Sequence, residues 1–184
     1  MKEVKMVTAC LALAGVLLGA GPALAAAAPA MPAGGLIRVW ASPTGNGLRS
    51  SIVITGAIGD YGTATTITAA GVPNANGNYV RVDLHRGTFK VNSTVLNAKA
   101  NNAEPNFNAS TCSAWLSVSG PVTLSDGTGL YKGISGSVNI TETYAFILPR
   151  YSSGAHEGQC NESNSVQPAG SWSSITGSGT VHFA

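Results

Sequence analysis

The chain has 184 residues, and its 10 basic and 8 acidic side chains give a formal net charge of +2. Only 10% of the residues are charged, and the lysines and arginines form no stripe or cluster. Binding to a phosphate backbone requires such a cluster, so the composition argues strongly against a nucleic acid as partner.

The N-terminus has the pattern of a secretory signal peptide. Two lysines within the first five residues precede an apolar run at 10–20, and small residues follow it. We predict a signal peptide over 1–25, with cleavage after Ala25 or Ala30. The protein would then be secreted and extracellular, or associated with the cell envelope, with no stable membrane span after cleavage. The alternatives are an uncleaved anchor, for which the apolar run is short, and a lipoprotein modified at Cys10, which precedes the run instead of following it.

The rest of the chain is predicted to be a leader followed by one domain. Residues 26–35 are mainly alanine, proline and glycine, and we expect them to be flexible. Residues 36–184 form the domain, which at roughly 150 residues can bury a core. Apolar residues alternate with polar ones and never recur at helical spacing, so we predict strands and no helix. The predicted strands cover 36–40, 51–57, 63–69, 79–92, 112–124, 125–147 and 174–183, with loops at 101–110 and 148–169. The segment 79–92 is either one long strand or a strand pair, with a bulge or bend at Arg86 and Gly87.

The clearest alternation lies between Ser125 and Ile147. Its apolar side chains share one parity: Leu130, Ile134, Val138, Ile140, Tyr144 and Phe146. Gly133 and Gly136 interrupt the pattern, where a long strand can bend. A curved antiparallel sheet of this kind closes on itself. We therefore predict an all-β fold, a single antiparallel β-barrel of about eight strands, with a two-sheet β-sandwich as the alternative.

Two cysteines follow the predicted signal peptide, Cys112 and Cys160. An even number in an exported chain predicts one disulfide. The alternative, a catalytic or metal-binding thiol, has no supporting spacing of cysteines or histidines. We expect no metal and no cofactor.

A family resemblance is carried by Asp126–Ser137 (DGTGLYKGISGS), in which a glycine turn and an aromatic residue lead through Gly-x-x-Gly into a long strand. This segment resembles the allene oxide cyclase and dirigent barrels, and Gly177–Val181 (GSGTV) is similar to the closing strand of that family. The resemblance implies an eight-stranded antiparallel barrel whose interior binds or guides apolar small molecules. Relatives often form dimers or trimers, so it also implies a homo-oligomer. No active-site residue of the family maps onto this chain.

One carboxylate falls on the predicted inner face. Glu142 shares the parity of the apolar residues around it, where burial would raise its pKa and suit it to acid–base catalysis. Lys132 has the same parity and could pair with it only if the two lie close together. The alternative is a carboxylate at the barrel rim, in water. The residues predicted to line a binding cavity are Leu116, Val138, Ile140, Tyr144 and Phe146, with Tyr79 at the rim.

Two tryptophans fall on predicted faces that are otherwise polar, Trp40 and Trp115. Either a loop, a second subunit or the leader covers them, or they form a recognition patch.

Three functions fit these features. The first is a secreted, non-enzymatic barrel that binds a hydrophobic small molecule or a surface partner. The second is a cyclase-type or dirigent-type enzyme that guides the closure of an apolar substrate, with Glu142 as its acid–base group. The third is a protein-interaction module, an inhibitor or adhesin, that acts through the loops at 101–110 and 151–167. A binder and an enzyme both need an interior cavity, and only the enzyme needs an ionisable group inside it.

Overall fold

The computed structural model describes residues 33–44, 48–163 and 165–184. The predicted signal peptide, its cleavage sites and most of the predicted leader lie outside the described residues.

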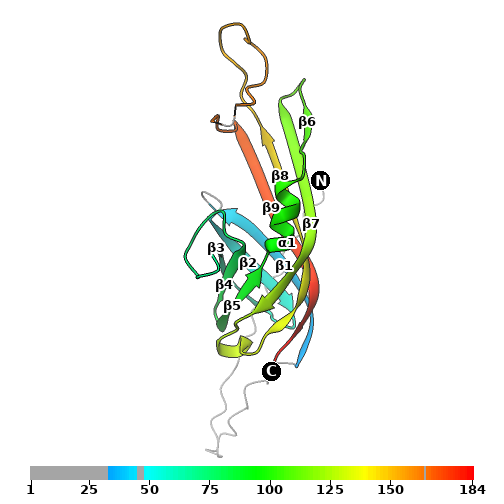
Figure 1. Ribbon diagram of the computed structural model, residues 1–184. Helices are drawn as coiled ribbons and strands as arrows, with labels where there is room; N and C mark the ends of the chain where they lie inside the picture. The colour runs from blue at the N-terminus through cyan, green and yellow to red at the C-terminus, as the bar shows by residue number, and fades with distance from the viewer. Residues whose placement is uncertain (1–32, 45–47, 164) are drawn as a thin grey trace, which may run out of the picture. The chain divides into compact units, whose positions relative to one another are not determined.

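Within these described ranges, nine strands form one antiparallel sheet in the order β5-β4-β3-β2-β1-β9-β8-β7-β6, and a further pairing of β5 with β7 closes eight of them into a barrel (Figure 1). The strands are β1 (Gly34–Thr44), β2 (Arg49–Gly56), β3 (Asp60–Ile67), β4 (Tyr79–Leu84), β5 (Gly87–Asn92), β6 (Asn106–Asn108), β7 (Ser113–Ser125), β8 (Ser135–Ile147) and β9 (Gly170–His182). β6 pairs with β7 alone and lies outside the barrel. The prediction of a closed antiparallel barrel is confirmed, and the two-sheet sandwich is excluded.

The two-residue period decides which side chains fill the barrel. On β7, Ala114, Val118, Val122 and Leu124 are buried, whereas the serines and threonines between them are exposed. A strand with one wet face and one dry face must alternate in this way. The alternation predicted for this strand is therefore confirmed.

The prediction that the domain contains no helix is wrong. Helix α1 (Thr94–Asn101) and the 3-10 turn η1 (Gly129–Tyr131) are both present. Only Leu96 of α1 is buried, so the helix has no apolar stripe that a sequence pattern could reveal.

Tertiary packing explains the position of α1. β5 pairs with β7 only at Thr123–Ser125, and β6 pairs only at Ser113–Trp115. Between these segments the edge of β7 lacks a strand on that side, and α1 packs over it: Leu96 lies directly on Gly120, and Lys99 Nζ donates to Ser119 O at 3.2 Å. This is the place where Pro121, which cannot donate to a ladder, is tolerated.

The turn η1 also corrects the predicted alternation. β8 begins at Ser135, and before it Tyr131 is fully buried whereas Leu130 is 49% exposed. The backbone turns through η1, so the two-residue period does not extend back to Leu130. Tyr131 instead contacts Phe89 and Phe183 and closes this end of the barrel.

A buried carboxylate anchors the closed end. Tyr131 Oη donates to Asp60 Oδ2 at 2.5 Å, and Arg86 donates to the same oxygen from its backbone N at 3.1 Å and from Nε at 3.4 Å. Burial alone would raise the pKa of Asp60, but these hydrogen bonds and one from the Tyr61 amide lower it to about 2. Burial and the bond to Asp60 raise the pKa of Tyr131 to about 12.

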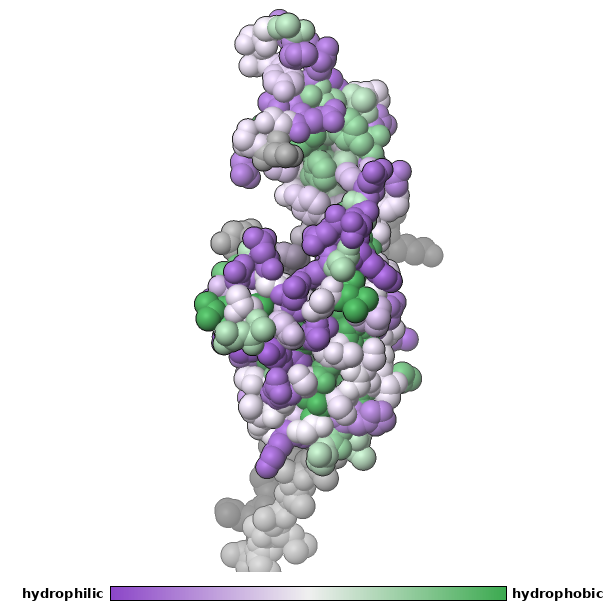
Figure 2. Space-filling view, viewed as in Figure 1, coloured by the Kyte–Doolittle hydropathy of each residue, from purple (hydrophilic) through white to green (hydrophobic). Residues whose placement is uncertain are grey.

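At the open end, β7, β8 and β9 project beyond the barrel wall. β8 pairs with β9 as far as Ile147 and Gly170, whereas β1 pairs with β9 only as far as Ile175. Figure 1 shows these strands rising past the others, with the loop that follows β8 at their tip, and Figure 2 shows hydrophobic residues gathered beneath that loop. The predicted disulfide is confirmed there: Cys112 and Cys160 are joined, with their Cα atoms 5.3 Å apart.

Candidate functional site: the barrel cavity

The interior of the barrel contains a cavity of about 610 Å³. Its walls come from every strand of the barrel, and helix α1 and the loop Ala75–Asn78 border it at the open end. Exposed residues such as Asn76 and Tyr144 are among those that line it, so the cavity reaches solvent at this end. The cluster around Tyr131 seals the other end.

The walls of the cavity are mostly aliphatic. Most of the side chains that form them are of small or medium size, and they include Val39, Ile52, Ile54, Val82 and Ile140. Larger side chains at these inward positions would fill a barrel of eight strands completely. The choice of valine, isoleucine and alanine therefore leaves an apolar space.

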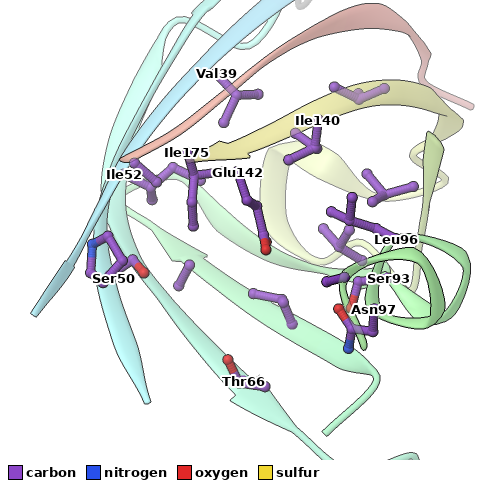
Figure 3. A pocket seen from close by; sticks show the side chains of 18 of the residues that line it. Val39, Ser50, Ile52, Thr66, Ser93, Leu96, Asn97, Ile140, Glu142 and Ile175 are labelled. Carbon is purple, nitrogen blue, oxygen red and sulfur yellow. The ribbon is translucent and has the colours of Figure 1, made fainter. Parts of the chain in front are cut away.

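Glu142 is the one acidic or basic residue among those that line the cavity. On β8 it lies between Val118 of β7 and Ile175 of β9, and Figure 3 shows its carboxyl group projecting into the space between the Ile52 wall and helix α1. Among the described residues, none donates a hydrogen bond to this carboxyl group or forms an ion pair with it. Burial raises the pKa of Glu142 above its ordinary value, because the carboxylate is poorly solvated there.

Polar groups gather at the open rim, where α1 meets the loop before β4. Ser93 Oγ donates to Asn78 O at 3.0 Å, and Asn97 Nδ2 donates to Gly77 O at 3.1 Å and to Asn78 Oδ1 at 3.1 Å. Thr66 and Ser50 add hydroxyl groups to the lining (Figure 3). These bonds hold the rim loop against the helix and fix the width of the opening.

Four of the residues predicted to bind a ligand line the cavity: Leu116, Val138, Ile140 and Tyr144. Phe146 and Tyr79 do not. Phe146 lies farther along β8, on the projecting part, where its ring contacts that of Tyr144 at 5.3 Å between centroids. Tyr79 belongs to the outer face of β4, and Lys90 Nζ lies over its ring at 4.4 Å. Parity alone cannot show where the barrel wall ends.

Lys132 is not a partner of Glu142. It is exposed and follows η1 at the closed end, outside the residues that line the cavity. The catalytic role of Glu142 stays a prediction.

The cysteines and histidines do not contribute to the cavity. Cys112 and Cys160 are consumed by the disulfide, His85 contacts Tyr61 O at 3.0 Å, and His156 contacts Gln159 Oε1 at 2.9 Å. Within the described part of the chain, no group of three or more histidine, cysteine or acidic side chains could hold a metal ion. The same residues include no helix that is long and apolar enough to cross a membrane.

The sequence reasoning missed the rim and one exposed aromatic residue. Ser93 and Asn97 fall at the start of an unpredicted helix, so no pattern marked them as cavity residues. Trp172 lies on β9, which begins four residues before the predicted strand, and its side chain is 61% exposed. The alternation of Trp172 with Ser173 and Ser174 is too weak to identify a strand.

Comparison with protein-family models, with curated proteins and with solved structures finds no match for this chain. What bears on its function is therefore the cavity itself: an apolar space, open at one end, into which Glu142 projects a carboxyl group that has no partner among the described residues.

Proposed function

We propose that this chain binds an apolar small molecule in the barrel cavity, with the polar group of that molecule beside Glu142. The observation that carries the proposal is an aliphatic cavity of about 610 Å³ that the protein's own side chains leave unfilled. This volume lies within the usual range for drug-sized ligands, roughly 300–1,000 Å³. Such pockets are mostly apolar and contain a few polar groups that orient the ligand, as Glu142 and the rim hydroxyls would do here.

The projecting sheet offers an apolar path to the opening. Phe107 of β6, Ala114 of β7 and Phe146 of β8 are paired in register, so their side chains share the face that continues the barrel interior. Phe146 contacts Tyr144, which lines the cavity. A ligand longer than the cavity could therefore extend along this apolar face.

The second candidate is an enzyme that guides the closure of an apolar substrate. Glu142 supports it, because a carboxyl group with a raised pKa in an apolar cavity is suited to donate or accept a proton. The resemblance to allene oxide cyclase and dirigent barrels points in the same direction, and a closed barrel of eight antiparallel strands is the fold that this resemblance implies. Membership of that family remains part of the proposal.

The third candidate, an interaction module acting through its loops, receives less support from the cavity, since such a barrel could be filled solid. Its two loops are held near each other, however. Arg150, just before the second loop, donates from Nη2 to Ser110 O of the first loop at 2.6 Å, and the disulfide joins Cys160 of the second loop to Cys112, just after the first. Export from the cell belongs to the proposal in all three cases, and the disulfide is compatible with an oxidising compartment.

A pair of adjacent substitutions tests the binding proposal. Ala64 lines the cavity, whereas Thr63, its neighbour on β3, faces out. Ala64→Phe should fill the cavity and reduce the binding of the neutral apolar dye N-phenylnaphthylamine by at least ~10-fold, whereas Thr63→Phe should leave it unchanged. Equal dye binding by both variants and the wild type would contradict an interior site. Native mass spectrometry of the purified protein would then identify a retained ligand.

Glu142→Gln separates the binder from the enzyme. The substitution keeps the shape of the side chain and removes its acid–base function. For a binder, the retained apolar ligand should still be bound, and incubation should leave it chemically unchanged. For an enzyme, the wild type should convert the ligand and the variant should bind it without conversion, as followed by mass spectrometry of the extract.

A further inference from the structure

All three tryptophans of the chain are exposed. Trp40 is 44% exposed, Trp115 is 52% exposed and Trp172 is 61% exposed. An indole ring has a large apolar surface, and proteins usually bury it. Exposed aromatic groups that cluster on one face indicate a binding surface for a ligand or a macromolecular partner.

The strand register places two of these rings in one row. Trp115 of β7 and Trp172 of β9 both pair with Ala145 of β8, from opposite sides. The three side chains therefore point to the same outer face of the projecting sheet, away from the cavity. The two tryptophans are two strand spacings apart, about 9.5 Å, with only a methyl group between them.

The surroundings of the pair are polar and uncharged. The next row of this outer face consists of Ser117, Thr143 and Ser174, and Ser117 Oγ lies 3.4 Å from Thr143 Oγ1. From Ser113 to Ser119 on β7, and at the positions paired with them on β8 and β9, none of the described outward-facing residues is charged. The surface can thus stack against a ring and exchange hydrogen bonds, and it offers no ionic contact.

We propose that this outer face binds an extended, uncharged, β-linked polysaccharide of the cellulose or chitin kind, with sugar rings stacked on Trp115 and Trp172. The C–H face of a pyranose ring packs on the electron-rich face of an indole. In an extended β-linked chain every second ring presents the same face, and that repeat is close to the spacing of the two tryptophans. The serine and threonine hydroxyls beside them match the hydroxyl groups of the sugar rings.

The charge pattern selects this partner over anionic ones. An acidic polysaccharide or an anionic lipid surface would require lysine or arginine around the rings. Among the described outward-facing positions around the pair, no basic residue is present. A flat, neutral, hydroxyl-bearing chain fits these conditions.

Binding at this face is independent of the cavity. Trp115 and Trp172 lie on the opposite side of the sheet from Tyr144 and Phe146. A small molecule can occupy the barrel while the outer face holds the protein on a polymer. Failure of either proposal leaves the other intact.

Trp40 provides a matched control. It pairs with Thr176, four residues along β9 from Trp172, beside a separate hollow of about 380 Å³ that Arg38 and Asn139 help to line. It therefore lies outside the row formed by Trp115 and Trp172, although it is the same residue type with a similar exposure.

The test measures binding of the purified protein to microcrystalline cellulose and to chitin by depletion from solution, and to cellohexaose and chitohexaose by tryptophan fluorescence. Trp115→Ala and Trp172→Ala should each weaken binding by ~10-fold or more, as the loss of one stacked ring does, whereas Trp40→Ala should change it less than ~2-fold. Trp115→Phe and Trp172→Phe keep an aromatic face and should retain most of the binding, which separates lost stacking from lost folding. The two polymers and their oligomers show which sugar is preferred.

Three results would overturn the proposal. The first is that neither polysaccharide is bound. The second is equal binding by the wild type and both alanine variants. The third is self-association of the protein that either alanine variant abolishes in sedimentation, because the face would then be an interface between copies of this chain.

Discussion

Asp60→Asn should destabilise the closed end of the barrel and remove much of the protein's acid sensitivity. The carboxylate of Asp60 accepts hydrogen bonds from Tyr131, Arg86 and the Tyr61 amide. These donors all favour the charged form, so the substitution removes an interaction that exists only in the folded state.

The pKa of Asp60 gives the magnitude. A decrease from 3.8 to about 2 corresponds to roughly 2.5 kcal/mol at pH 7, at 1.36 kcal/mol per unit. Arg86 is itself exposed, and solvent screening reduces this to roughly 1–2 kcal/mol. Because the folded pKa is depressed, the stabilisation is complete above the unfolded pKa of about 4 and is lost as the pH falls through 2.

Urea unfolding of the wild type and of Asp60→Asn between pH 7 and pH 2 measures this directly. At pH 7 the variant should be less stable by roughly 1–2 kcal/mol, and the difference should shrink steadily below pH 4. Asp83→Asn is the matched control: Asp83 pairs with Arg81 in water, and its loss should change stability by less than ~0.5 kcal/mol. A difference between wild type and Asp60→Asn that does not depend on pH would refute the reasoning.

Three further predictions follow from the same structure. Burial raises the folded pKa of Glu142, so Glu142→Gln should stabilise the protein by roughly 0.5–2 kcal/mol at pH 8 and by almost nothing at pH 4. A stability difference between the variant and the wild type that stays constant across this pH range in thermal unfolding would contradict the burial of the carboxylate. Reduction of the Cys112–Cys160 bridge, which spans 48 residues, should lower the free energy of unfolding by roughly 3–4 kcal/mol in denaturant titrations with and without reductant. Leu96→Ala should lower the free energy of unfolding by roughly 2–4 kcal/mol, because Leu96 is only 1% exposed. Val95→Ala, at a position that is 53% exposed, should lower it by less than ~0.5 kcal/mol. Equal losses would mean that α1 does not pack on β7 as described.

The barrel could be predicted because burial on one side imposes a period of two. On β7 this pattern survives for thirteen residues, since its even positions face the interior along the whole strand. The pairing of Cys112 with Cys160 was equally accessible, because only two cysteines follow the predicted signal peptide. These features depend on local composition, which the sequence shows directly.

The remaining features depend on contacts between distant segments. α1 exists because the edge of β7 needs a cover, and its own sequence has one buried residue, Leu96. The cavity rim is formed where that helix meets the loop at Gly77 and Asn78, 15 to 20 residues before Ser93 and Asn97.

The position along β8 at which the cavity ends also could not be predicted from the sequence. Strands in the barrel wall and strands in the projecting sheet have the same two-residue period, so alternation could not show that Tyr144 lines the cavity and Phe146 does not.

The short contact between β5 and β7 has a consequence for ligand entry. Only three residue pairs close the barrel there, whereas thirteen join β8 to β9. The wall should therefore open first along this seam, as α1 moves away from β7. Amide hydrogens of α1 and of Lys90–Asn92 should then exchange before those of β8. A ligand too large for the end opening would then enter the cavity sideways through the wall. Cross-linking α1 to β7 would slow this entry without changing the affinity for a ligand that is already bound.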